Sequence, residues 1–350
     1  MIKSLETQMG CKVVNKSKRI PLLDYVRVIT AFLVIYGHLY PYDPENYVRV
    51  FIYQFHMPLF FVVSGMLHKY DGTIQVRKYI RTILIPVVFY ATVFFAITGI
   101  LYHCGYGDYK ESILAEIWGG NLLQTYANYL KYSIIGICKG FMMLDGPCWF
   151  LIALFYCKLF MDFALQKKKI ALFLWVLFFL VLCVHIHKYL FAANAIMAMP
   201  FYVFGYVGKN KLLAIAKMKY PISLSILTIL IVLFIMYVNG SVSMWGISFG
   251  NFGKLSIPVF YIQGVVGTLM LFSLCAIFKK PNPMVTKWAN SLISILGLQV
   301  LFIFLSDNFL GVEWNYFEAL GVSVVIMFLC IGCHGIIVRY CPILIGKTKK

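Results

Sequence analysis

Three ionisable side chains interrupt an apolar stretch near the start of the chain, residues 22–40 (LLDYVRVITAFLVIYGHLY): Asp24, Arg27 and His38. A charge near the centre of a bilayer costs about 2.5–3.5 kcal/mol on insertion scales, so such residues indicate a functional site. On a helix, the eleven residues from Arg27 to His38 make about three turns. Both side chains then lie within about 20° on one face and about 16 Å apart along the axis. This face carries a fixed cation and an imidazole that exchanges protons near neutral pH.

Each of these residues also has a structural interpretation. Arg27 follows Asp24 by three residues, a spacing that suits a buried ion pair which fixes helix packing. His38 lies between Tyr36 and Tyr40 and also suits the water–membrane interface. Asp24 is about 21 Å from His38 along the same helix and therefore cannot orient its ring.

A second stretch, residues 53–65 (YQFHMPLFFVVSG), carries another histidine beside a proline. Pro58 removes one backbone donor and frees a carbonyl within the helix. Gly65 permits the close approach of a neighbouring helix. His56 lies at a depth similar to that of His38, so the sequence predicts that the two imidazoles share one pocket.

A third stretch, residues 77–86 (RKYIRTILIP), opens with the basic residues Arg77, Lys78 and Arg81. Guanidinium groups bind phosphate oxygens in pairs, so this cluster suits a phosphorylated ligand. The alternative interpretation is the general excess of Lys and Arg on the cytoplasmic side of membrane proteins. The sequence contains no P-loop and no HExxH motif, and we expect no metal.

Composition identifies the class of protein. Of the 350 residues, 61% are hydrophobic, 17% are aromatic and only 13% are charged, and the mean hydropathy is +0.83. These values predict an all-α, polytopic membrane protein whose first partner is the lipid bilayer. The net charge of +18 is explained by basic cytoplasmic loops, and no nucleic-acid partner is expected.

Apolar runs between polar residues predict about ten transmembrane helices. With the N-terminus in the cytoplasm, 23 of the 31 Lys and Arg residues fall on the inner side and six on the outer side. The prediction is therefore a basic cytoplasmic tail (1–21), one transmembrane domain (22–338) and a second basic cytoplasmic tail (339–350). An amphipathic interfacial helix is predicted over residues 122–138. The ten spans are 22–40, 48–67, 80–101, 148–165, 170–187, 192–208, 221–238, 257–278, 291–306 and 317–338.

These motifs, taken in order, resemble the acyltransferase 3 family of integral membrane O-acyltransferases, in particular its sugar O-acetylase branch with fucose 4-O-acetylase-like proteins. The resemblance covers almost the whole chain. A late motif, in which the family frequently has histidine, has Gln299 here. The stretches that carry the resemblance are LDYVRVITAFLVIYGH (23–38), FHMPLFFVVSGML (55–67), RKYIRTILIP (77–86), GPCWFLIALF (146–155), AMPFYVFGYVGKN (198–210) and NSLISILGLQVLF (290–302).

The resemblance implies an O-acyltransferase, most often an acetyltransferase, in a bacterial inner membrane. It would move an acyl group from cytoplasmic acetyl-CoA to a hydroxyl of a surface carbohydrate or glycolipid. His38 is then expected to be the general base, since its ordinary pKa is near 6.5. The other expected roles are donor binding or gating for Arg27, reactant positioning or oxyanion stabilisation for His56, acyl-CoA binding for Arg77, Lys78 and Arg81, and substrate binding for Asp24, Trp149 and Gln299.

A transporter or flippase of polysaccharide intermediates is the alternative function. It would also use charges inside the membrane and a helix interrupted by proline. The sequence shows no inverted or parallel repeat, and the ionisable groups gather in the first three predicted helices. Both features favour the enzyme.

Overall fold

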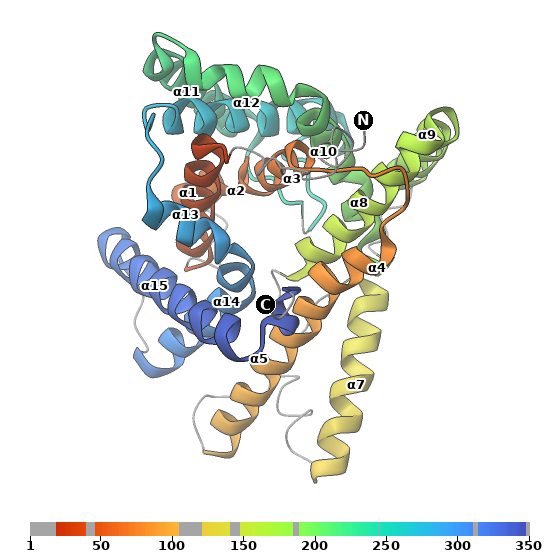
Figure 1. Cartoon of the computed structure of the whole chain (residues 1–350), viewed down its shortest axis with the longest axis vertical. Coiled ribbons are helices and arrows are strands. Elements are labelled where there is room, and N and C mark those ends of the chain that lie inside the picture. Colours follow the sequence, from red (N-terminus) through yellow and green to blue (C-terminus); the bar gives the residue numbers. More distant parts are fainter. Residues whose placement is uncertain are drawn as a thin grey trace, which may run out of the picture.

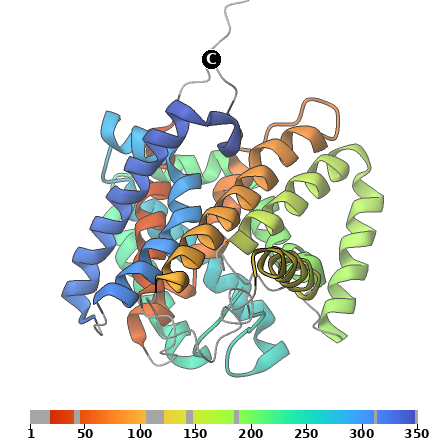
Figure 2. The same cartoon turned by 90° about the horizontal axis from the view of Figure 1, so that it is seen from below.

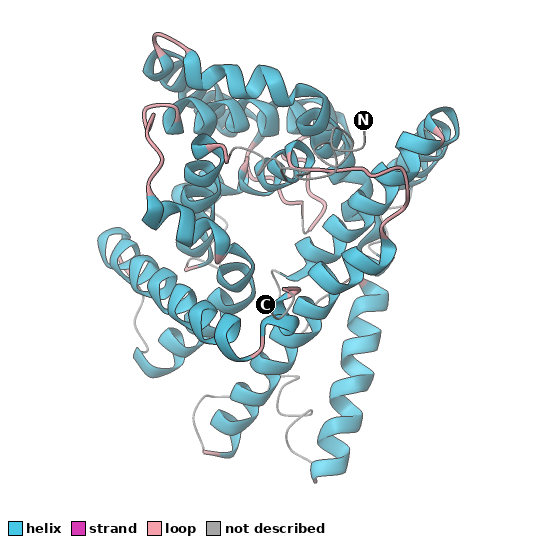
Figure 3. Ribbon diagram, in the orientation of Figure 1, coloured by secondary structure: helices cyan, strands magenta, loops and turns pink. Residues whose placement is uncertain are grey.

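The computed structural model describes residues 19–39, 46–104, 121–140, 148–184, 189–244, 246–310 and 314–347. Within these ranges the chain consists of helices and the loops between them (Figure 3). One isolated antiparallel bridge pairs Ser243 with Ser248. Most of the predicted N-terminal tail and the last three residues lie outside the described residues.

The order of the helices is shown in Figure 1. The first half of the described chain contains α1 (Pro21–His38), α2 (Tyr47–Tyr53), α3 (His56–Met66), α4 (Val76–Tyr79), the π-helix η2 (Ile80–Leu84), α5 (Ile85–His103), α7 (Leu122–Lys139), α8 (Trp149–Gln166) and α9 (Lys168–Val184). The second half contains α10 (Ala192–Ala214), α11 (Pro221–Asn239), α12 (Ile257–Cys275), α13 (Pro283–Asn290), α14 (Leu292–Leu310), α15 (Tyr316–Tyr340) and the short 3-10 helices η4 (Tyr189–Phe191), η5 (Ile215–Lys217), η6 (Gly253–Ser256) and η7 (Pro342–Ile345).

Local signals in the sequence explain several helix ends. The Asn121 side chain caps α7 in a capping box with Gln124, and Asn315 does the same for α15 with Glu318. α7 ends at Lys139 and is capped by Gly140, which has φ 68°, a conformation that glycine adopts without strain. The helix predicted over residues 122–138 is therefore confirmed, and its position at the membrane interface stays a prediction. It lies beside α5, where the Phe95 and Tyr129 rings are 3.9 Å apart, and Figure 2 shows it end-on.

A helix lies at each of the ten predicted spans, but fewer of them have the length and composition of a membrane span. Six helical segments of the described chain are long and apolar enough, and a seventh is added if the bent pair α13–α14 counts as one span. The axes of that pair differ by 69° at Ser291. The structure thus shows a multi-pass arrangement of helices. The number ten and the cytoplasmic position of the termini stay predictions.

The backbones of α3 and α10 approach each other closely where the two helices cross. A Cβ atom on Gly65 would clash with the backbone carbonyl of Tyr202, and one on Gly205 would clash with that of Val62. Two facing glycines therefore let the backbones approach, which is how helices pack tightly in membranes. This contact fixes α3, which begins with His56, against the rest of the bundle.

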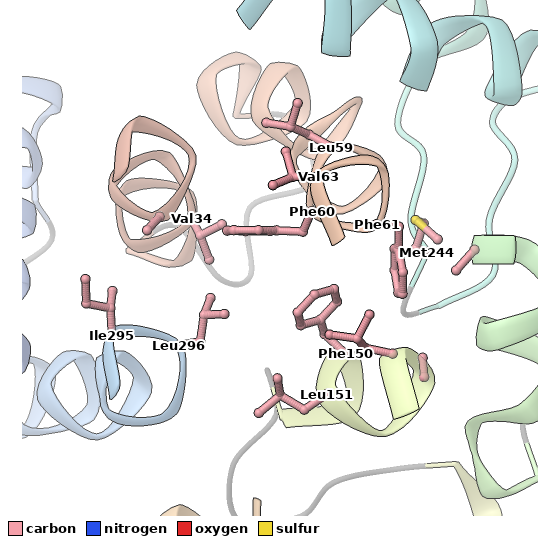
Figure 4. Packing of buried hydrophobic residues seen from close by; sticks show 14 of the residues in the cluster. Val34, Leu59, Phe60, Phe61, Val63, Phe150, Leu151, Met244, Ile295 and Leu296 are labelled. Carbon is pink, nitrogen blue, oxygen red and sulfur yellow. The ribbon is translucent and has the colours of Figure 1, made fainter. Parts of the chain in front are cut away.

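Apolar side chains from four helices and one loop converge beside this crossing. Figure 4 shows Val34 of α1, Phe60 and Phe61 of α3, Phe150 of α8 and Leu296 of α14 around a common space, with Met244 approaching from the loop between α11 and α12. The Phe61 and Phe150 rings meet edge to face at 4.9 Å. Except for Phe61, these side chains line the cavity described next.

Candidate active site

A cavity of about 380 Å³ lies between α1, α2, α3, α8 and α14. Its wall is mostly apolar, with a small number of polar side chains that converge on it, as in sites that bind small molecules. The polar and aromatic side chains that matter most are His38, Arg49, Tyr53, His56, Trp149, Gln299 and Asp307.

Both predicted imidazoles reach this cavity, and one tyrosine lies between them. The Tyr53 hydroxyl is 3.1 Å from Nδ1 of His38. The same ring lies 4.8 Å from the His56 ring, centroid to centroid. The Arg49 guanidinium lies 4.6 Å from the Tyr53 centroid. The prediction that His38 and His56 share one pocket is therefore confirmed.

The break between α2 and α3 positions this group. α2 ends at Tyr53 and α3 begins at His56, with Phe55 in a non-helical conformation between them. Pro58 has no N–H to donate to a carbonyl one turn earlier, which favours an interruption at this point. Nδ1 of His56 lies 2.9 Å from the Ile52 carbonyl oxygen, so the histidine itself bonds across the break.

Gln299 projects into the cavity from α14. Its side chain is fully buried, and neither Oε1 nor Nε2 has a hydrogen-bond partner in the part of the chain that the structure describes. A buried amide without partners costs about 1–3 kcal/mol per unsatisfied group, so it is rarely kept without a reason. A bound ligand with a hydroxyl or amide would supply the missing partners.

Sequence reasoning did not identify the loop between α11 and α12, which contributes Ser243 and Met244 to the cavity wall. Two buried asparagines hold this loop. The Asn194 amide donates to the Met244 carbonyl at 2.6 Å, and the Asn239 amide donates to the Phe249 carbonyl at 2.8 Å. The glycines and asparagines in the sequence of this loop were the signal from which an ordered loop could have been predicted.

The same loop contains a Gly-x-Ser-x-Gly sequence, residues 246–250. In hydrolases this pattern carries a nucleophilic serine on a tight turn between a strand and a helix. Here Ser248 is exposed, and its backbone pairs with Ser243 inside a loop. The structural context of a nucleophile is therefore missing at this serine.

Asp24 and Arg27 lie at the opposite end of α1 and do not line the cavity. Asp24 accepts a hydrogen bond of 2.6 Å from Nε of Arg19 and lies 3.8 Å from the Arg27 guanidinium. The Arg27 guanidinium also donates to the Ala289 carbonyl of α13 at 2.9 Å. The structure shows the ion pair that the spacing suggested, and it attaches α1 to α13.

Arg77, Lys78 and Arg81 are exposed on α4 and η2. The turn that precedes them is held by a carboxylate of α8. The Gln75 backbone N–H and the Tyr79 hydroxyl both donate to Asp162, at 2.9 and 3.1 Å. The three basic residues therefore form a solvent-facing group on a fixed turn.

His68 completes this buried contact, and the sequence analysis missed it. Its Nε2 lies 3.1 Å from Asp162, and its Nδ1 lies 2.8 Å from the Tyr202 hydroxyl. Burial, together with the positive charge of Lys158, lowers the pKa of His68 below its ordinary value, although Asp162 acts in the opposite direction. Two charges inside the predicted span 148–165, Lys158 and Asp162, were the signal that pointed here.

A second buried chain of polar groups joins α5, α14 and α15. The Ser294 hydroxyl is 2.7 Å from both the Tyr90 hydroxyl and Nδ1 of His334. The Lys347 ammonium donates to the other nitrogen of His334 at 3.0 Å. His334 follows Cys330 and Cys333 in a Cys-x-x-Cys-His run, but the described residues include no group of three or more side chains placed to hold a metal.

The family model described as an acyltransferase domain, acyltransferase 3, matches residues 20–339. The match covers most of the chain, and the chain belongs to this family of membrane acyltransferases. No curated protein and no solved structure matches it. His38, His56 and Gln299 all lie within the matched region, as do the basic residues of α4 and η2.

Proposed function

We propose that this protein is an O-acyltransferase that transfers an acetyl group from acetyl-CoA to a hydroxyl of a carbohydrate or glycolipid on the outer side of the membrane. The observation that carries the proposal is the cavity in which His38 and His56 flank Tyr53 and which Gln299 also lines, with an amide that is unsatisfied among the described residues. Proton exchange and hydroxyl binding are the two abilities that alcohol acylation needs.

The part of the cavity that Trp149 and Gln299 line suits a sugar as the acyl acceptor. Trp149 forms part of the wall, and a flat aromatic face packs well against the C–H face of a sugar ring. Gln299 offers one donor and one acceptor side by side, which match the hydroxyls of a carbohydrate. In this proposal an acceptor hydroxyl lies near the imidazoles while Gln299 holds the ring.

The donor end is proposed to lie at the basic turn. Acetyl-CoA is polyanionic, and Arg77, Lys78 and Arg81 present three exposed cations on a turn that Asp162 holds. Arg27 is already bound to Asp24 and Ala289, so its proposed contribution is to fix α1. Asp24 is likewise bound by Arg19 and is proposed to have a structural role.

The chemistry at the imidazoles is acid–base catalysis. The acceptor hydroxyl must lose a proton as its oxygen attacks the thioester carbonyl, and the leaving thiolate must gain one. A neutral imidazole can take the first proton and return it. The sequence-based expectation gives this role to His38, and both imidazoles line the cavity in which it would occur.

The test uses purified protein in liposomes with acetyl-labelled CoA on the side of the basic turn and a panel of methyl glycosides on the other. Wild type is compared with His38→Ala, with folding checked by size-exclusion chromatography. Acetylated glycoside formed by wild type and lost in the variant supports the proposal. Unmodified glycoside carried across the vesicle membrane with no acetyl transfer would instead identify a transporter of the kind given above as the alternative.

A further inference from the structure

The proton on each imidazole is placed by the hydrogen bond at its Nδ1 atom. A backbone carbonyl only accepts hydrogen bonds, so Nδ1 of His56, 2.9 Å from the Ile52 carbonyl oxygen, carries the proton. A neutral imidazole has one N–H, so Nε2 of His56 holds a lone pair. His56 therefore presents a proton acceptor to the cavity that its ring lines.

In His38 the Nδ1 atom accepts a hydrogen bond, whereas in His56 it donates one. Its Nδ1 faces the Tyr53 hydroxyl at 3.1 Å. Between a phenol and a neutral imidazole, the phenol O–H is the stronger donor and the imidazole nitrogen the stronger base. The Arg49 guanidinium, 4.6 Å from the Tyr53 centroid, strengthens this donor because a nearby cation favours negative charge on the phenol oxygen. Nδ1 of His38 therefore accepts, and the proton of His38 lies on Nε2.

We infer that the two histidines have different roles in the proposed acyl transfer: Nε2 of His56 is the general base, and Nε2–H of His38 is the hydrogen-bond donor to the oxyanion. Tyr53 is a positioning residue that fixes the donor form of His38. This inference rests on the proposed function. It exchanges the roles that the sequence suggested for the two residues.

The reaction balances with these assignments. The acceptor hydroxyl gives its proton to Nε2 of His56 while its oxygen forms a bond to the thioester carbonyl carbon. The carbonyl oxygen becomes an oxyanion and accepts the hydrogen bond from Nε2–H of His38. The intermediate then collapses, the carbon–sulfur bond breaks, and the thiolate of CoA takes the proton back from His56. Both imidazoles end neutral, in their starting forms.

The first test needs no turnover and therefore remains informative even if the proposed reaction is wrong. Nitrogen-15 NMR of the full chain in nanodiscs, with labelled histidine, distinguishes protonated from bare ring nitrogens. His38→Gln and His56→Gln assign the two sets of signals. We expect a bare Nδ1 in His38 and a bare Nε2 in His56. A bare Nε2 in His38, or a protonated Nε2 in neutral His56, overturns the assignment.

Tyr53→Phe tests the positioning role in the same experiment. Loss of the hydroxyl should let His38 populate both neutral forms, while the His56 signals stay unchanged because the Ile52 carbonyl is untouched. Tyr237→Phe is the matched control, since that side chain is 86% exposed on α11 and far along the chain from this group. An unchanged His38 signal in Tyr53→Phe removes Tyr53 from the mechanism.

The second test compares amide replacements with an acceptor that supports turnover. Glutamine keeps an N–H near the position of Nε2 but cannot take up a proton usefully near neutral pH. His38→Gln should therefore recover much of the kcat that His38→Ala loses, whereas His56→Gln should remain about 100-fold or more below wild type. A general-base limb should persist in the pH–kcat profile of His38→Gln. The reverse pattern, with His56→Gln the more active variant, contradicts the assignment.

Discussion

The Tyr79 hydroxyl donates a 3.1 Å hydrogen bond to the carboxylate of Asp162, which joins the basic turn to α8. The Gln75 N–H donates to the same carboxylate. Asp162 is fully buried, whereas the basic side chains beside Tyr79 are exposed. The position of the proposed donor-binding residues therefore depends on one carboxylate that lies 87 residues later than Gln75.

Asp162→Asn should weaken the binding of acetyl-CoA without slowing the acyl-transfer step. The amide keeps the size of the side chain but weakens its charge-assisted hydrogen bonds, which contribute about 1.5–3 kcal/mol each when fully formed. We expect the KM for acetyl-CoA to rise about tenfold with little change in kcat, as measured by initial rates. Asp71→Asn is the control, because Asp71 is exposed and its side chain bonds within its own loop. A rise in the acceptor KM alone would contradict the proposed donor site.

The lowered pKa of His68 leads to a prediction of how the stability of the protein depends on pH. Its pKa is lowered in the folded protein, mainly by burial. As the pH falls below about 6.5, the unfolded chain takes up a proton at this position more readily than the folded chain does, so the free energy of unfolding decreases. Thermal unfolding in detergent between pH 7.5 and 5 should show this loss, and His68→Gln should reduce its slope.

A free energy of unfolding that increases as the pH falls would be equally informative. If the contribution of His68 to stability increased on acidification, the folded protein would be binding the proton. The ion pair between His68 and Asp162 would then outweigh burial and the charge of Lys158. The comparison with His68→Gln isolates this residue from other groups that titrate in the same range.

Gln299→Leu should make the protein more stable but weaken its use of the acceptor. Removal of a buried amide without partners is expected to raise the free energy of unfolding by about 1 kcal/mol. If Gln299 holds the acceptor, the acceptor KM should rise at least about tenfold, while the KM for acetyl-CoA stays constant. Gln263 provides a matched control: it is also fully buried with both side-chain atoms unsatisfied in the described chain, but it does not line the cavity. Gln263→Leu should change stability alone.

Gly65→Ala tests the α3–α10 crossing. The added methyl group meets the Tyr202 carbonyl, a backbone atom that cannot rotate away. We expect a loss of about 3 kcal/mol or more and a low yield of folded protein, because overpacking against backbone forces the helices apart. Gly321→Ala is the control, since no atom lies near its Cβ position. Fluorescence-detected size exclusion and thermal unfolding measure both variants, and equal stability would contradict the tight crossing.

Helical periodicity and depth were sufficient to predict that His38 and His56 share a pocket, because both depend on short-range spacing. The same reasoning anticipated the Asp24–Arg27 pair and the close approach at Gly65. It could not find the Ala289 partner of Arg27, which lies 262 residues away. It also could not find Tyr53, whose position depends on where α2 ends and α3 begins. The buried contact of His68 with Asp162 brings distant segments together, and a single sequence does not specify such pairs.

The facing glycines of α3 and α10 limit how this molecule can move. Each backbone blocks the other where a side chain would begin, so neither sliding nor rotation of one helix past the other is available without separating them. The pair is expected to behave as one rigid body that carries His56 and one wall of the cavity. Any opening that admits an acceptor must therefore come from the other walls: α1, α2, α8, α14, or the loop that two asparagines hold between α11 and α12.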